Sequence, residues 1–100
     1  MKSQIQKIKT YINFAFKSRE IKLGVDDIIT SRGAKLILVS KGLAESSYKK
    51  MEAFAKRNNV SLFLLELEDF VELLQSENIK AIAIFSGGLA DAIKKNLTNF

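Results

Sequence analysis

The chain has no cysteine, histidine, proline or tryptophan among its 100 residues. Without cysteine there can be no disulfide, thiol nucleophile, iron–sulfur cluster or attached c-type haem. Without histidine, imidazole proton transfer and histidine-based triads are excluded, and the two absences together remove the common zinc sites. Any chemistry would have to come from carboxylates, amines, hydroxyls or an oxygen-bound ion. We therefore expect neither enzyme activity nor a cofactor or metal.

Long hydrophobic runs are also absent. No segment reaches the ~18–20 apolar residues that a membrane span requires. The first 16 residues carry Lys2, Lys7 and Lys9 and lack the apolar region of a secretory signal. We expect a cytoplasmic protein with no membrane partner. With 47% apolar residues, residues 1–100 can form a single domain with its own core.

The charge is positive and unevenly distributed. The net charge is +5, which is typical of small proteins that bind an acidic partner such as RNA, DNA or a membrane surface. Residues 1–57 carry 13 Lys and Arg against 5 Asp and Glu, whereas residues 58–100 carry 3 against 6. Any electrostatic contact with an acidic partner is therefore expected mainly on the first half of the chain.

Hydrophobic periodicity predicts alternating helices and strands. Ile5, Ile8, Ile12, Ala15 and Phe16 follow a helical spacing and form one apolar stripe. A continuous apolar run at residues 36–39 and largely apolar stretches at 60–65 and 79–85 are typical of strands buried on both faces. Further helices are predicted from Asp26, over residues 44–59, 67–74 and 89–97, and a short strand over residues 21–23. This order predicts a three-layer α/β/α sandwich around a mixed, four-stranded central sheet.

Three patterns resemble sites of chemistry, but each has a simpler interpretation. Ser47 and Lys50 have the S-x-x-K spacing of serine acyl enzymes, yet the partner motifs are missing. The carboxylates of residues 66–72 could hold Mg²⁺ or Ca²⁺, but acids in a first helical turn also favour the helix dipole. The Ser86-Gly87-Gly88 turn could bind an anion, although it lacks the phosphate-loop lysine.

An ordered set of short segments resembles the kink-turn RNA-binding ribosomal protein family. The segments are INFAFKSREIKLG at residues 12–24, KLILVS at 35–40, ESSYKKM at 45–51, NVS at 59–61, IAI at 82–84 and GLA at 88–90. The resemblance covers roughly residues 10–98. It is to the large-subunit ribosomal proteins seven-Ae and thirty-e, which have a pelota-like fold, and most closely to the bacterial YlxQ-like branch. It implies the same α/β/α sandwich and a role in a ribonucleoprotein.

The resemblance also implies an RNA-binding site. The family's Gly-x-Asn-Glu-x-x-Lys run, which reads the kink-turn, corresponds here to Gly24, Val25, Asp26, Asp27 and Thr30. The family's second RNA-contacting loop corresponds to Ser76, Glu77, Asn78 and Ile79. The phosphate contacts expected around these segments are Lys17, Arg19, Lys22, Arg32, Lys35 and Lys41.

The sequence departs from the family at the positions that read RNA. Asp26 and Asp27 replace an asparagine and a glutamate, and Thr30 replaces the lysine. Carboxylates near phosphate are repulsive, and an Asp side chain cannot donate as an Asn amide does. The segment between Gly24 and Lys35 is also about one helical turn of ~3.6 residues shorter than in the family, which predicts a truncated recognition helix.

Two functions from different classes therefore remain. The first is a ribosome-associated RNA-binding protein that recognises kinked or structured RNA with a weakened motif. The second is a diverged relative without kink-turn binding that acts as a protein-interaction module, which the changes at Asp26, Asp27 and Thr30 favour. In either case we expect a monomer.

Overall fold

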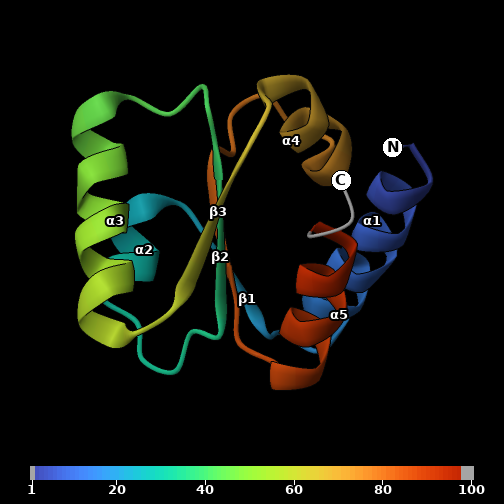
Figure 1. Cartoon of the computed structure of the whole chain (residues 1–100), viewed down its shortest axis with the longest axis horizontal. Helices are drawn as coiled ribbons and strands as arrows, with labels where there is room; N and C mark the ends of the chain where they lie inside the picture. The colour runs from blue at the N-terminus through green and yellow to red at the C-terminus, as the bar shows by residue number, and fades with distance from the viewer. Residues whose placement is uncertain (1, 98–100) are drawn as a thin grey trace.

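The computed structural model describes residues 2–97 and shows a three-layer α/β/α sandwich (Figure 1). The helices and strands alternate along the chain as the hydrophobic periodicity predicts. They are α1 (Lys2–Lys17), β1 (Ile21–Leu23), α2 (Val25–Ile29), β2 (Leu36–Ser40), α3 (Glu45–Asn58), β3 (Ser61–Leu65), α4 (Leu67–Leu74), β4 (Ala81–Ile84) and α5 (Gly87–Leu97). No helix within the described residues is long and apolar enough to cross a membrane.

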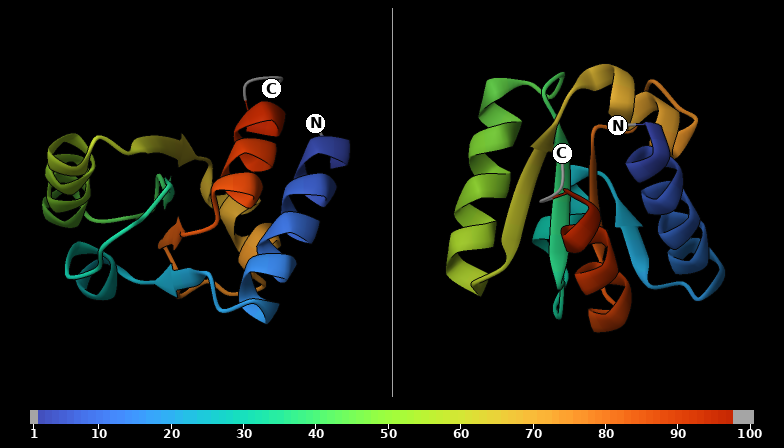
Figure 2. Two further views of the ribbon diagram at one scale, coloured as in Figure 1. Left: turned by 90° about the horizontal axis from the view of Figure 1, so that it is seen from below. Right: turned by 45° about the vertical axis from the view of Figure 1, so that its right-hand side comes forward.

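The central sheet is mixed, in the order β1-β4-β2-β3. β4 runs antiparallel to both of its neighbours, with Ile82 opposite Leu23 on one side and Leu38 on the other. β2 and β3 are parallel, with Leu36 opposite Ser61. α2 and α3 cover one face of the sheet, and α1, α4 and α5 cover the other (Figure 2).

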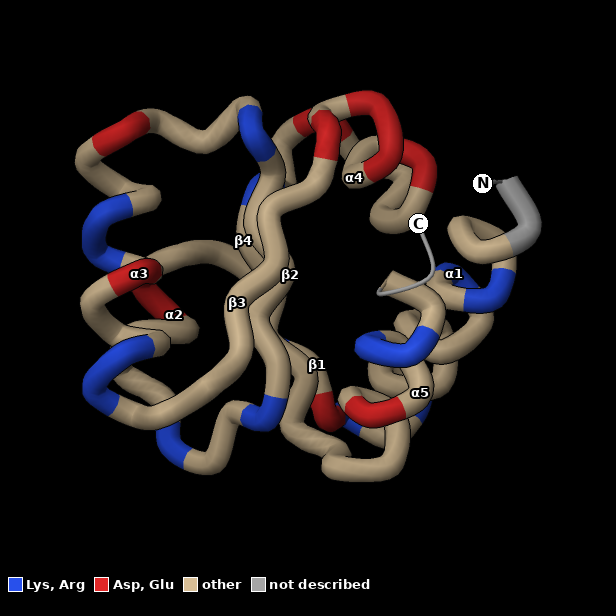
Figure 3. The backbone as a smooth tube through the Cα atoms, viewed as in Figure 1, with Lys and Arg blue, Asp and Glu red and all other residues tan. Residues whose placement is uncertain are grey.

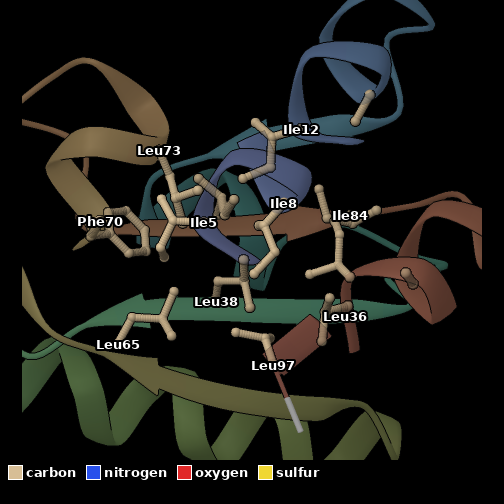
Figure 4. Close-up of a cluster of buried hydrophobic side chains, with 14 residues drawn as sticks. Ile5, Ile8, Ile12, Leu36, Leu38, Leu65, Phe70, Leu73, Ile84 and Leu97 are labelled. Atoms are coloured by element: carbon tan, nitrogen blue, oxygen red, sulfur yellow. The ribbon is translucent and has the colours of Figure 1, made fainter. Parts of the chain in front are cut away.

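Each face of the sheet has its own apolar core. The alternate residues of β2 divide between them, because successive side chains of a strand point to opposite faces. Leu36 and Leu38 pack with α1, α4 and α5 in the larger core, where the labelled side chains of the three helices converge on the sheet (Figure 4). Ile37 and Val39 pack with α2 and α3 in the smaller one. Both central strands are therefore buried on both faces, as their continuous apolar runs predict.

Two helices end in the same left-handed turn. Arg19 follows α1 with φ 58°, while its N–H donates to the Phe16 carbonyl and the next N–H, of Glu20, donates to the Ala15 carbonyl. Asn59 follows α3 with φ 57° and the same pair of bonds. This is the Schellman arrangement, in which the last carbonyls of a helix are satisfied by the two residues that follow it. Both turns lead directly to the start of a strand.

Two predictions about burial are wrong. Phe16, placed on the apolar stripe of the first helix, is 42% exposed, because the stripe ends with Ala15 in the last turn of α1. The run at residues 60–65 is not buried on both faces: Leu64 is 44% exposed and only Leu65 is buried. The reason is that β3 lies at the edge of the sheet and has a neighbouring strand on one side only.

Candidate nucleic-acid interface

The turn between β1 and α2 requires a glycine. Gly24 has φ 88°, a value that residues with a Cβ rarely adopt. Its N–H donates to the Ala81 carbonyl at 2.9 Å, and its carbonyl accepts from the Ile28 N–H at 3.2 Å. A Cβ at Gly24 would meet no atom within 4 Å. The glycine is thus needed for its backbone conformation, and the space beside it is open to a ligand.

The helix after this turn is short and acidic. α2 contains five residues, which confirms that the helix after Gly24 is brief. Asp26 and Asp27 lie exposed in its first turn. The Thr30 hydroxyl, at the position of the family's lysine, donates to the carbonyls of Asp26 at 3.1 Å and Asp27 at 3.3 Å. Thr30 therefore closes its own helix and contributes no positive charge.

Residues 76–79, which the resemblance implies form a second RNA-contacting loop, lead to the strand that bonds this turn. β4 begins immediately after it, and Gly24 and Ser40 bond to the carbonyls of Ala81 and Lys80. The Asn78 N–H donates to the Ser76 Oγ at 3.1 Å, while Ile79 packs against the larger core. The structure thus brings one group of the expected site residues to a common region, here called the Gly24 end. Its members are Gly24, Val25, Asp26, Asp27, Thr30, Lys41, Ser76, Glu77, Asn78 and Ile79.

The Gly24 end is a poor surface for phosphate. Its exposed charges include the carboxylates of Asp26, Asp27 and Glu77. Lys41 forms an ion pair with Glu66, just before the first turn of α4, and Lys80, immediately before β4, is a second, half-buried cation in this region. The positive charge of this region is therefore limited, and its acids would repel a phosphate backbone.

The remaining expected cations lie elsewhere. Arg19 precedes β1 and Gly24 follows it, so an extended stretch of roughly 16 Å separates them at about 3.3 Å per residue. Lys22 lies midway along β1, opposite Ala83, with its side chain exposed. Lys35 donates its N–H to the Ile84 carbonyl, and Phe85 donates to the Glu20 carbonyl, which places Lys35 and Arg19 where β4 ends. The structure does not bring these cations together with Gly24.

The opposite end of the sheet is basic. It gathers the end of α1, the loop before β2 and the end of α3, because β1, β2 and β3 all begin where β4 ends. The exposed cations there, here called the basic end, are Lys17, Arg19, Arg32, Lys35, Lys56 and Arg57. Within residues 2–97 the structure pairs none of these six side chains with a carboxylate. In Figure 3, blue segments lie along the lower margin near the end of α3, together with red segments beside β1 and on α5, whereas red segments gather around α4 at the upper margin.

Two members of the basic end were not among the expected site residues. Lys56 and Arg57 occupy the last turn of α3, where cations favour the helix dipole. They belong with Lys35 because Ser61, which follows α3, pairs with Leu36. The sequence shows two adjacent cations at the end of a predicted helix, which marks them as candidates for phosphate contact. Only the strand pairing shows that they lie near Lys35.

The comparisons with known proteins bear on the fold. No family model matches the chain, and no curated protein matches it in sequence. Among solved structures, a protein with unknown function from Bacillus halodurans C is similar, with a TM-score of 0.80. The similarity covers 92% of this chain and 97% of that chain at 10% sequence identity. The chain therefore shares its α/β architecture with that protein.

Proposed function

We propose that the protein binds RNA, as the resemblance to the kink-turn ribosomal proteins implies, and that it holds the phosphate backbone at the basic end. The observation that carries this proposal is the group of six exposed Lys and Arg side chains without carboxylate partners. Cations that are not already paired release counterions from a nucleic acid at no cost of breaking an ion pair. Backbone binding of this kind carries little sequence information.

The acids of the Gly24 end support contact at the basic end rather than kink-turn recognition. Asp26, Asp27 and Glu77 face the region where a kink-turn would bind in the family. Gly24 keeps the open backbone geometry, but no lysine replaces the one lost at Thr30. Recognition of a kink-turn would therefore have to overcome repulsion from these carboxylates.

The experiment is a titration of the protein against labelled RNAs at two salt concentrations. The probes are a kink-turn RNA, a plain duplex and a single strand of equal length. We expect measurable binding to RNA that weakens steeply with salt and shows little preference for the kink-turn. The double variant Arg32→Gln with Lys35→Gln should lower the slope of log K against log salt by about 1.4–1.8, because two phosphate contacts are lost.

A matched variant separates the basic end from net charge. Lys49→Gln with Lys50→Gln removes the same charge from the exposed face of α3, outside the basic end. It should change the salt slope much less. Equal effects of the two double variants would show that net charge alone attracts RNA, and no binding by the unmodified protein would reject the proposal.

A protein-interaction module is the second candidate, and the acidic Gly24 end favours it. An exposed surface with Asp26, Asp27 and Glu77 suits a basic protein partner rather than RNA. The same titration distinguishes the two functions. Failure to bind any of the three RNAs at the lower salt concentration would leave the protein-interaction function as the better account.

A further inference from the structure

The outer edge of β3 is an unprotected strand edge. β3 has the sequence SLFLL, without a charge or a proline, and it lies at the end of the sheet. Natural proteins usually blunt such edges with charge, proline or very short strands, because free backbone groups pair with other chains. β1, at the other edge, has three residues with an exposed lysine at its centre. The two edges therefore differ in their capacity to pair.

The hydrogen bonds of β3 show which backbone groups face outward. The Leu65 carbonyl accepts from the Lys41 N–H at 2.8 Å, so Leu65 is turned toward β2. The direction of the backbone N–H and carbonyl groups alternates along a strand. Those of Phe63 therefore point toward β2, and those of Leu62 and Leu64 point away from it. The N–H and carbonyl groups of Leu62 and Leu64 therefore point to the open side of the sheet.

Apolar side chains accompany these groups on the face covered by α3. Leu62 lines a surface cleft of about 450 Å³, and the more exposed Leu64 lines a second cleft of about 220 Å³. Tyr48 of α3 lines both, so the two clefts adjoin at Tyr48 between the strand and the helix, and together they are here called the groove. A strand added to β3 would bring its alternate side chains against this groove.

The charged residues before and after β3 in the sequence indicate which strand would pair with its free edge. Lys56 and Arg57 precede its start, whereas Glu66, which is paired with Lys41, and the exposed Glu68 follow its end. An antiparallel second β3 reverses this order. It would place the acids of one copy beside the cations of the other at both ends of the contact.

We propose that β3 pairs with β3 of a second copy of the chain, antiparallel and with the two-fold axis at Phe63. Leu62 of each copy then lies opposite Leu64 of the other, and each such pair exchanges both of its backbone hydrogen bonds. The result is a continuous sheet across two molecules with a self-complementary interface. This dimer does not require RNA, although it places Lys56 and Arg57 of the basic end beside acids of the other copy, and it replaces the expectation of a monomer.

Sedimentation of the 100-residue chain over a range of concentrations, without RNA, tests the dimer. Leu64→Pro removes an N–H that faces outward, so it leaves the bonds between β2 and β3 intact while blocking the pairing. We expect the unmodified protein to reach the mass of a dimer, and Leu64→Pro to weaken association by at least about tenfold. Leu64→Ala, which loses the same side chain but keeps the N–H, should associate more strongly than Leu64→Pro.

A crosslink tests the register. The chain has no cysteine, so Phe63→Cys introduces a single thiol, which at the two-fold axis faces its own copy. The Cα atoms of such a pair lie about 4.5 Å apart, within the range of a disulfide. Oxidation should give covalent dimer from Phe63→Cys and little from Leu67→Cys, although Leu67, beyond β3, is the more exposed of the two positions. A monomer at all concentrations, or a dimer that Leu64→Pro leaves unchanged, would overturn the proposal.

Discussion

Arg19 has two roles that can be separated. It lies in the left-handed conformation that closes α1, and its side chain belongs to the basic end. A residue with a Cβ in this conformation is strained by roughly 1–2 kcal/mol, and glycine is not. The backbone role therefore favours glycine, while the proposed contact with phosphate requires the guanidinium. A role in binding phosphate would explain why this position has arginine rather than glycine.

We expect Arg19→Gly to be more stable than Arg19→Ala by about 1 kcal/mol, because the charge is lost in both variants and only alanine keeps the strained Cβ. Urea unfolding of the two variants measures the difference. Both should lose RNA affinity to a similar extent, since neither carries the cation. Equal stabilities would show that the turn at residue 19 is not held in the left-handed conformation.

At the scale of elements, the sequence predicts the order of helices and strands but not their position in the sheet. The apolar runs at residues 36–39 and 60–65 look alike, yet β2 is central and β3 is an edge strand. The difference depends on pairing between distant segments, which no local pattern records. The same holds for the candidate site. Arg19 and Gly24 are close in sequence, but β1 between them places them at opposite ends of the sheet.

α2 provides a test of whether side chains or helix length limit kink-turn recognition. Asp26→Asn with Thr30→Lys restores two of the family's residues. We expect tighter RNA binding overall but an unchanged ratio of kink-turn to duplex affinity, because α2 has only five residues and Glu77 remains exposed in the loop before β4. Glu68→Lys, which changes the net charge equally outside the motif, is the control. A kink-turn preference that appears only in the double variant would show that the side chains were limiting.

At the scale of the whole molecule, the arrangement of the strands places most exposed cations and most carboxylates toward opposite ends of the sheet. Six exposed cations occupy the end where β4 finishes, and carboxylates of α2, α4 and the loop before β4 lie toward the end where it begins. The net charge of +5 conceals this separation. RNA would be drawn to one end, and two copies could align their charges oppositely when their β3 strands pair. One asymmetry thus supports both proposals, although each has its own test.

A variant with unchanged net charge distinguishes the position of charge from its amount. Lys17→Gln, Arg19→Gly, Asp26→Asn and Asp27→Asn together remove two cations and two anions, all on segments outside β3. We expect weaker RNA binding and a shallower salt dependence, because two phosphate contacts are lost while the total charge stays at +5. The variant with only Asp26→Asn and Asp27→Asn is the control, and it should bind at least as tightly as the unmodified protein. If the fourfold variant bound RNA as tightly as the unmodified protein, the long-range attraction of a positive molecule would account for binding without a defined basic end.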